Sequence, residues 1–185
     1  MKTSNNIVLI LDLDETLIHA TETPLEIPYS FRYADYFIYK RPYLEEFLRA
    51  ISTDFDIAIW SSADDRYVEE IVARIKPPFV DFTFVWGRSR CTTRRDYNLD
   101  TYVHEKRLKK VKKQGYAIER MLIVDDSPEK TRDNFGNAIY INPFEGNQDD
   151  QELQLLSTYL KSLKDLHNVR NLEKRGWRNQ IQTNR

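Results

Sequence analysis

Short, uninterrupted runs of apolar residues recur along the chain at intervals that fit a repeating pattern of strands and helices. Five runs are rich in β-branched or aromatic residues: Ile7–Leu11, Ile57–Trp60, Phe82–Trp86, Met121–Val124 and Ala138–Ile141. A continuous apolar run of this length, without alternation, is typical of a strand that is buried on both faces. The pattern therefore predicts five strands of a central, mostly parallel sheet.

Amphipathic segments separate these strands. Apolar residues at helical spacing predict helices over residues 41–51, 63–75, 105–114 and 149–166, and Ser127 with Pro128 predicts the start of another short helix. Because strands and helices alternate, we expect an α/β fold: a Rossmann-like, mostly parallel sheet with helices on both faces.

Two segments depart from this pattern. The segment after the first strand, about residues 25–40, is rich in Tyr and Phe and predicts a small aromatic β-hairpin, the flap. Residues 169–185 are polar and basic apart from Trp177, so we expect a flexible C-terminal tail. The chain has 185 residues, which is about the size of one domain. Residues 1–168 are therefore expected to form a single domain.

Charge and composition exclude several classes of protein. The 28 Lys and Arg residues nearly balance the 29 Asp and Glu residues, so bulk charge does not predict a polyanion-binding protein. The single cysteine, Cys91, excludes an intrachain disulfide and a zinc site built of cysteines. No apolar run approaches the ~20 residues of a membrane span, and the first residues lack the pattern of a signal peptide. We therefore expect a cytoplasmic protein without membrane contact.

Acidic and hydroxyl side chains follow three of the predicted strands. Asp12 and Asp14 follow the first strand, Ser61 the second, and Asp125 with Asp126 the fourth. Ligands bind at the carboxyl ends of the strands in a parallel α/β sheet, and clustered oxygen ligands favour Mg²⁺. A single Asp-x-Asp is as typical of a turn as of a site. A second acidic strand end more than 100 residues later favours the metal site.

These motifs resemble one enzyme superfamily. Leu11–Leu17 resembles the first motif of the haloacid dehalogenase (HAD) superfamily of phosphatases, whose nucleophile is an aspartate. With Arg41-Pro42 and the Asp125–Pro128 motif, the chain from about residue 7 to 166 is similar to the small C-terminal-domain phosphatase (NLI-interacting-factor-like) family. That family acts on phosphoserine and phosphothreonine of proteins, so the resemblance implies a Mg²⁺-dependent phosphoric monoester hydrolase.

The resemblance implies roles for the residues of these motifs. Asp12 would attack phosphorus and form an aspartyl-phosphate, while Asp14 would protonate the leaving oxygen and later activate water. Thr16 would steady the loop by hydrogen bonding. Mg²⁺ would be held by a carboxylate oxygen of Asp12, the main-chain carbonyl of Asp14 and Asp126, with Asp125 in support.

Two further motifs of the family match this chain. Ser61 stands where the family has a hydroxyl that donates to the phosphoryl group, although a helix cap uses the same side chain. The family also has a lysine that offsets charge on the nucleophile and the phosphoryl oxygens. The spacing of its third motif assigns this lysine to Lys106, with Lys109 as the alternative.

The substrate is predicted from the flap and from charge. The family binds apolar residues beside the phosphate on an aromatic surface, which implies that Tyr36 and Phe37 contact the substrate. Arg88 would also face the substrate, although a plain surface position fits it equally. A phosphorylated protein or peptide is therefore the expected partner. The stretch Arg88–Lys113 has ten basic and three acidic residues, so the same chemistry on a nucleic-acid end or a small phosphoester stays open, as does a non-catalytic phospho-binding module.

Overall fold

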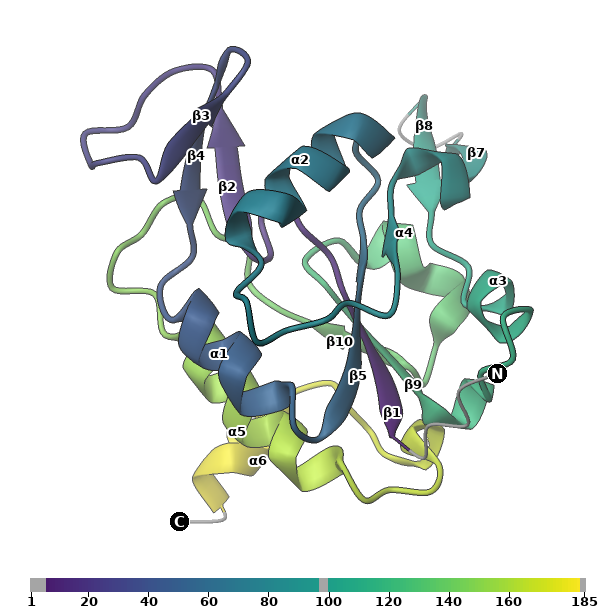
Figure 1. The fold of residues 1–185 in the computed structure, drawn as a ribbon. Helices are drawn as coiled ribbons and strands as arrows, with labels where there is room; N and C mark the ends of the chain where they lie inside the picture. The colour runs from purple at the N-terminus through teal and green to yellow at the C-terminus, as the bar shows by residue number, and fades with distance from the viewer. Residues whose placement is uncertain (1–5, 97–99, 184–185) are drawn as a thin grey trace.

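The computed structural model describes residues 6–96 and 100–183. Its centre is a five-stranded sheet with the strand order β10-β9-β1-β5-β6, and every neighbouring pair in it is parallel (Figure 1). The strands are β1 (Ile7–Leu11), β5 (Phe55–Trp60), β6 (Val85–Trp86), β9 (Met121–Asp125) and β10 (Ala138–Tyr140). All five predicted strands are present, although β6 is shorter than its apolar run.

The central position of β1 determines where the polar strand ends meet. All residues of β1 and β9 are buried, as their apolar runs predict. Leu11 lies opposite Ile59 of β5 on one side and Val124 of β9 on the other. The residues that follow these positions, among them Asp12 and Asp125, therefore leave the sheet at the same edge.

Helices cover both faces of the sheet, which confirms the predicted α/β architecture. The helices α1 (Leu44–Ile51), α2 (Asp65–Ile75) and α5 (Glu152–Leu163) share one hydrophobic core with the sheet. The short helix α3 (Lys109–Lys112) packs on the opposite face through a smaller core. Odd and even residues of β1 divide between these cores, because successive side chains of a strand point to opposite faces: Leu9 faces the larger core and Val8 the smaller one.

Some predicted helix boundaries are wrong. The helix expected over residues 105–114 is reduced to α3, because residues Thr101–Glu105 form a strand, β8. The helix expected from residue 63 begins at Asp65, since Asp64 caps it by accepting hydrogen bonds from the backbone N–H groups of Arg66 and Tyr67. The short helix predicted at Pro128 is present as α4 (Pro128–Thr131).

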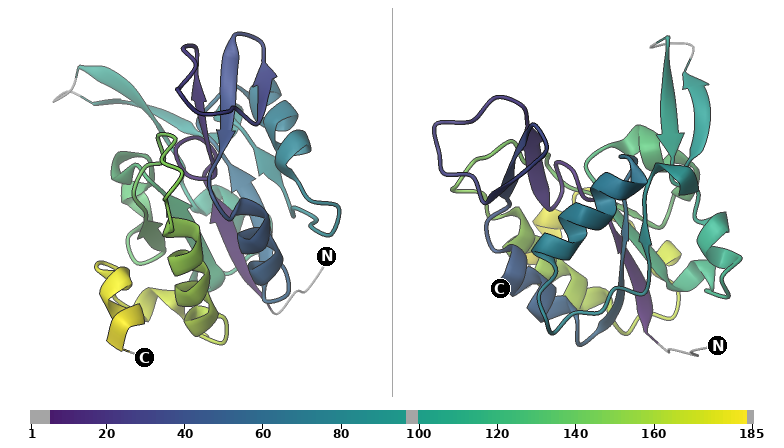
Figure 2. Two further views of the ribbon diagram at one scale, coloured as in Figure 1. Left: turned by 90° about the vertical axis from the view of Figure 1, so that its left-hand side faces the viewer. Right: turned by 45° about the horizontal axis from the view of Figure 1, so that its top comes forward.

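Two antiparallel elements rise beyond the sheet edge at which the central strands end (Figures 1 and 2). One is the flap, which is a three-stranded sheet of β2 (Ile18–Thr21), β3 (Phe31–Tyr33) and β4 (Tyr36–Lys40) rather than the predicted hairpin. The other is a hairpin of β7 (Thr92–Asp96) and β8, which we did not predict. The two elements flank the edge that carries the acidic residues.

The prediction of a flexible tail is wrong for residues 169–183. This segment contains the short helices η4 (Val169–Asn171) and α6 (Trp177–Thr183), and Val169 and Trp177 are buried. The Trp177 ring stacks on Tyr159 of α5 at 5.4 Å, and its Nε1 donates a 2.9 Å hydrogen bond to the carbonyl of Tyr140. The contacts of one large apolar side chain thus hold this segment against the domain, although the residues around it are polar. Within residues 6–96 and 100–183, no helix is long and apolar enough to cross a membrane; the cytoplasmic location stays a prediction.

Candidate active site

Two carboxylates and one ammonium group form the buried centre of the site. Asp12 follows β1 and its backbone N–H donates a 2.9 Å hydrogen bond to the carbonyl of Val124. The Nζ of Lys106 lies 2.5 Å from Oδ1 of Asp12 and 2.7 Å from Oδ2 of Asp125. All three side chains are fully or almost fully buried. The edge of the sheet therefore brings together residues that are 94 and 19 positions apart in sequence.

The backbone of Lys106 is fixed where β8 ends. Its N–H donates a 2.7 Å hydrogen bond to the carbonyl of Lys130, and its carbonyl accepts one from the amide of Asn134. The same amide group of Asn134 accepts a 3.0 Å hydrogen bond from the N–H of Leu108. Lys109 begins α3 and is exposed. The structure therefore places Lys106, and not the alternative Lys109, against Asp12.

The charges of this centre do not balance. Burial lowers the pKa of Lys106, but the carboxylates of Asp12 and Asp125 outweigh burial and raise the pKa above its ordinary value. Burial and the negative charge of Asp12 raise the pKa of Asp125, although Lys106 opposes this effect. A second lysine, Lys130 of α4, lies 4.0 Å from Asp126 and was missed by sequence reasoning. Its side chain is partly exposed, so the buried centre itself keeps two carboxylates for one ammonium group.

Three carboxylates form a set that fits a hard divalent cation. One oxygen each of Asp12, Asp125 and Asp126 lies within 4.8 Å of the others. Oδ2 of Asp12 and Oδ1 of Asp126 are buried and have no hydrogen-bond partner among the described residues. Both oxygens of Asp125, in contrast, accept hydrogen bonds, from Lys106 and from the backbone N–H of Ser127. An all-oxygen set with buried, unpaired carboxylate atoms suits Mg²⁺.

The side chain of Asp14 lies outside this set and is held separately. The phenol of Tyr67 donates a 2.5 Å hydrogen bond to Oδ1, and the hydroxyl of Ser61 donates one of 3.1 Å to Oδ2. Burial raises the pKa of Asp14; the hydrogen bond from Tyr67 lowers it, and the charge of Asp12 raises it further, so the pKa lies above its ordinary value. Sequence reasoning missed Tyr67, because a tyrosine in the first turn of a helix has no distinctive pattern.

Ser61 and Thr16 differ in part from their expected contacts. The Ser61 hydroxyl also accepts a 3.0 Å hydrogen bond from the N–H of Ala63. The same hydroxyl therefore holds Asp14 and stabilises the turn that follows β5. The hydroxyl of Thr16, which we expected to steady the loop, is buried without a hydrogen-bond partner among the described residues. The carbonyl of Thr16 instead accepts a 3.1 Å hydrogen bond from Arg41.

Arg41 is the residue that holds the loop after β1. Its guanidinium is buried and donates two hydrogen bonds, of 2.9 and 2.7 Å, to the carboxylate of Asp150. Further hydrogen bonds reach the carbonyls of Thr16 and Asn142. From the sequence, Arg41 was interpreted only as part of a motif that opens a helix. Its role depends on Asp150, which is 109 residues away.

The structure separates the two flap residues that were predicted to contact substrate. Tyr36 lies opposite Tyr33, and both rings contact Tyr67, with centroids 6.3 and 5.6 Å away. Phe37 is the next residue of β4 and therefore points to the other face of the flap, where it contacts Tyr29. Only the Tyr36 face is adjacent to the side chain that holds Asp14, so the prediction that Phe37 contacts substrate is not supported by its placement.

Arg88 lies near the site but outside its buried centre. It begins the short helix η1 (Arg88–Arg90) and is exposed. Its Nε donates a 2.9 Å hydrogen bond to the carbonyl of Ser62, directly after Ser61. Within the described part of the chain no carboxylate pairs with Arg88, so its terminal nitrogens are available to an anionic substrate.

Three aspartates at the carboxyl ends of β1 and β9, with a buried lysine after β8 and a flap beside them, match the architecture of a HAD-type phosphatase. The chain belongs to the NLI interacting factor-like phosphatase family, whose sequence model matches residues 7–170. The resemblance of its motifs to this family is therefore confirmed.

Individual relatives show the same likeness. The chain is 30% identical to CTD small phosphatase-like protein 2 of Dictyostelium discoideum, over 90% of this chain and 29% of that protein. It is also 30% identical to mitochondrial import inner membrane translocase subunit TIM50 of Phytophthora infestans, over 84% of this chain and 34% of that protein. Its fold resembles that of the fission yeast RNA polymerase II CTD phosphatase Fcp1 bound to beryllium fluoride, with a TM-score of 0.57 and 20% identity over 89% of this chain and 53% of that one. The chain thus spans about a third or less of these two curated relatives.

Proposed function

We propose that this chain is a Mg²⁺-dependent phosphatase that hydrolyses phosphoserine or phosphothreonine of proteins through an aspartyl-phosphate on Asp12. The observation that carries the proposal is the placement of Lys106 between Asp12 and Asp125, which leaves Oδ2 of Asp12 without a partner among the described residues. The hydrogen bond from Lys106 holds the Asp12 carboxylate in one orientation, as a nucleophile requires, and leaves its other oxygen free for a metal ion.

The first step needs a nucleophile, a general acid and positive charge that stabilises the phosphoryl oxygens. A carboxylate oxygen of Asp12 attacks phosphorus, and the bond between phosphorus and the serine oxygen breaks. Lys106 offsets charge on Asp12 and on the phosphoryl oxygens. When bound by Asp12, Asp126 and the main-chain carbonyl of Asp14, Mg²⁺ would offset repulsion between the nucleophile and the phosphoryl group. Ser61 would donate a hydrogen bond to the phosphoryl group from its place beside Asp14.

Asp14 is the proposed proton carrier. Burial raises the pKa of Asp14, which increases the protonated fraction near neutral pH and suits a general acid. In the first step its carboxyl group gives a proton to the departing serine oxygen. In the second step the resulting carboxylate takes a proton from the water that attacks phosphorus, and the bond from phosphorus to Asp12 breaks. Tyr67 and Ser61 hold the carboxyl group in place for both transfers.

A protein substrate is favoured by the flap and by the relatives. The Tyr33 and Tyr36 rings form an aromatic face beside Tyr67, next to Asp14, where residues flanking a phosphoserine can pack. A matched relative is named as a CTD small phosphatase-like protein, and the similar structure is a CTD phosphatase. Because another matched relative is named as a translocase subunit, a non-catalytic phospho-binding module is the second candidate. The intact set of Asp12, Asp14 and Lys106 favours catalysis.

The test compares Asp12→Asn with the matched variant Asp81→Asn, whose side chain is fully exposed. Asp12→Asn is expected to abolish hydrolysis of both an aryl phosphate and a phosphoserine peptide, while Asp81→Asn retains it. Chelation by EDTA should remove activity and Mg²⁺ should restore it. Beryllium fluoride should protect the wild type but not Asp12→Asn against thermal unfolding. Activity of Asp12→Asn within about tenfold of wild type, or full activity in chelator, would overturn the mechanism; peptide binding without turnover by wild type would favour the second candidate.

A further inference from the structure

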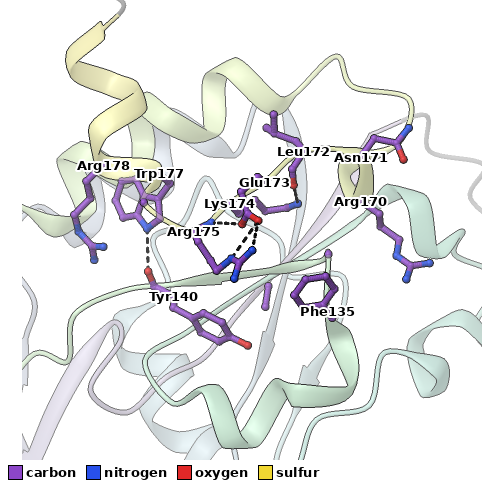
Figure 3. Close-up of a pocket in the computed structure, with 13 residues that line it drawn as sticks. Phe135, Tyr140, Arg170, Asn171, Leu172, Glu173, Lys174, Arg175, Trp177 and Arg178 are labelled. Carbon is purple, nitrogen blue, oxygen red and sulfur yellow. Dashed lines mark hydrogen bonds and ion pairs between the residues drawn. The ribbon is translucent and has the colours of Figure 1, made fainter.

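A cavity of about 490 Å³ lies along the outer edge of the sheet, between β10 and the C-terminal segment (Figure 3). Trp177 and Arg178 lie at one end of it and Phe135 with Arg170 at the other. Eight of its lining residues, 171–178, follow the last residue of the family match, which ends at residue 170. The cavity is therefore largely built by a part of the chain that the family match does not include.

The floor of this cavity is the open edge of a strand. β10 is the last strand of its sheet, and it pairs only with β9 within the described part of the chain. The backbone N–H and C=O of Ile139 face β9, so the same groups of Ala138 and Tyr140 face away from the sheet. The Tyr140 carbonyl accepts the hydrogen bond from Trp177, but no described residue bonds to the Ala138 N–H and C=O or to the Tyr140 N–H. These groups can pair with another extended backbone.

The wall opposite the strand is basic. It carries four cations and one carboxylate: Arg170, Lys174, Arg175, Arg178 and Glu173. Arg175 and Arg178 pair with glutamates. Lys174 is almost fully buried, yet its Nζ bonds to two backbone carbonyls, and neither it nor Arg170 has a carboxylate partner among the described residues. Burial lowers the pKa of Lys174 and the nearby charge of Arg170 lowers it too, against Glu173. An anionic ligand would offset the positive charges of Arg170 and Lys174.

An apolar contact is available at the rim. Phe135 is 75% exposed, the largest exposed fraction among the described large hydrophobic residues. It is followed by Gly136, which has a positive φ of 86° and lets the chain turn into β10 while the side chain of Arg170 packs closely above it. An exposed aromatic residue, an open strand edge and two cations without a carboxylate partner among the described residues thus line one cavity.

We propose that this cavity binds an extended, acidic peptide segment of a partner protein. The segment would pair with the outer edge of β10, place an acidic side chain against Arg170 and Lys174, and cover Phe135 with an apolar side chain. Tyr140 is the register partner of Asp125, and adjacent strands lie about 5 Å apart. A partner bound here would therefore lie close to the carboxyl ends of the strands, where the candidate active site is. Its binding does not depend on catalysis.

The first test measures binding by fluorescence anisotropy, with the full chain and a labelled, end-capped peptide of alternating Glu and Val. The matched variants are Arg170→Glu, in the cavity wall, and Lys161→Glu, on the exposed side of α5. Both change the net charge equally. Arg170→Glu is expected to weaken binding by about tenfold or more, since it replaces a charge-assisted contact with repulsion, while Lys161→Glu has little effect. Equal loss in both variants, or equal binding of a Lys-Val peptide, would overturn the proposal.

The second test examines strand pairing through the peptide, so the fold of the protein is unchanged. An extended strand presents the N–H groups of alternate residues to opposite sides. One peptide is N-methylated on its glutamates and another on its valines. We expect one of them to lose binding and the other to keep it. Equal binding of both, or equally tight binding of an oligonucleotide of the same charge, would show general anion adsorption and contradict the peptide site.

Discussion

The phenol oxygen of Tyr67 lies 2.5 Å from Oδ1 of Asp14, while the ring of Tyr67 contacts Tyr33 and Tyr36 of the flap. One side chain of α2 thus touches both the candidate acid and the surface where a substrate would pack. Any ligand that displaces these rings acts on the orientation of Asp14 through a single hydrogen bond. In the proposed mechanism, substrate recognition and proton transfer would therefore both depend on Tyr67.

Removing this hydroxyl by Tyr67→Phe should change the pH profile. A hydrogen bond to the charged form lowers the pKa of Asp14, so its loss raises the pKa. In the proposed mechanism Asp14 acts as an acid in the first step, so activity should be lost as pH rises through its pKa. We expect the basic limb of kcat/KM for a phosphoserine peptide to move to higher pH and kcat to fall roughly tenfold, part of what a positioned acid contributes.

The matched control for this variant is Tyr33→Phe. The Tyr33 ring packs on Tyr67, but no hydrogen bond joins its hydroxyl to Asp14, which is held by Tyr67 and Ser61. Its pH profile should equal that of wild type. A Tyr67→Phe profile that overlays the Tyr33→Phe profile would show that the phenol only packs against the acid.

Lys106→Met should remove most activity, whereas Lys109→Met should leave it unchanged. Only Lys106 reaches Asp12 and Asp125, and the loss of a positioned charge of this kind costs about 10²–10³ in kcat. Lys109 is exposed at the start of α3. Steady-state kinetics with an aryl phosphate distinguish the two, and thermal unfolding with Mg²⁺ shows whether the Lys106 variant is folded. Similar losses from both variants would contradict the assignment.

Arg41→Met should destabilise the fold strongly. Its buried guanidinium pairs with Asp150 through two hydrogen bonds, and breaking a buried pair costs about 3–5 kcal/mol. Arg49→Met is the matched control, because its pair with Glu45 is more than half exposed and such pairs contribute about 0.3–0.5 kcal/mol. Urea unfolding measures both free energies. Equal, small losses would show that the loop after β1 does not depend on Arg41.

The features that the sequence predicted depend on local patterns, whereas most of the missed features depend on contacts between residues far apart in the chain. β1, β5 and β9 are buried on both faces, so their apolar runs identify them without knowledge of their neighbours. The acidic pairs follow these strands directly, so Asp12 and Asp126 could be placed at one edge.

The missed features depend on distant partners or on weak patterns. Arg41 acts through Asp150, and Tyr67 acts through Asp14, 53 residues away. β7 and β8 were missed because most of their side chains are exposed or partly exposed and show no apolar alternation. The C-terminal segment was missed because only the contacts of Trp177 with Tyr159 and Tyr140 reveal that it folds back.

The flap offers a direct test of which face meets the substrate. Tyr36→Ala should raise KM for a phosphopeptide several-fold, because Tyr36 contacts Tyr67 beside Asp14. Phe37→Ala should not, since its ring contacts Tyr29 on the opposite face. Neither variant should change KM for a small aryl phosphate. A higher peptide KM for Phe37→Ala alone would mean that substrate crosses the other face of the flap.

Salt dependence distinguishes a protein substrate from a nucleic acid. The stretch Arg88–Lys113 has ten basic and three acidic residues, but several of these charges are engaged within the fold. Arg94 and Arg107 pair with Glu105, Arg95 pairs with Asp100, and Lys106 is buried.

Lys110 also donates hydrogen bonds to the carbonyls of Arg90 and Cys91. Five of the ten cations therefore remain to neutralise the phosphates of a strand, fewer than the roughly 6–10 contacts that give a steep salt dependence. We predict that kcat/KM for a phosphopeptide changes by less than about tenfold between 50 and 200 mM salt, against ~10³ or more for a ligand with 6–10 phosphate contacts. Steady-state kinetics with a phosphopeptide and with a 5′-phosphorylated oligonucleotide at both salt concentrations provide the comparison. A steep salt slope together with preferred turnover of the oligonucleotide would identify nucleic-acid ends as the substrate, because only a polyanion contacts enough of these side chains to respond in that way.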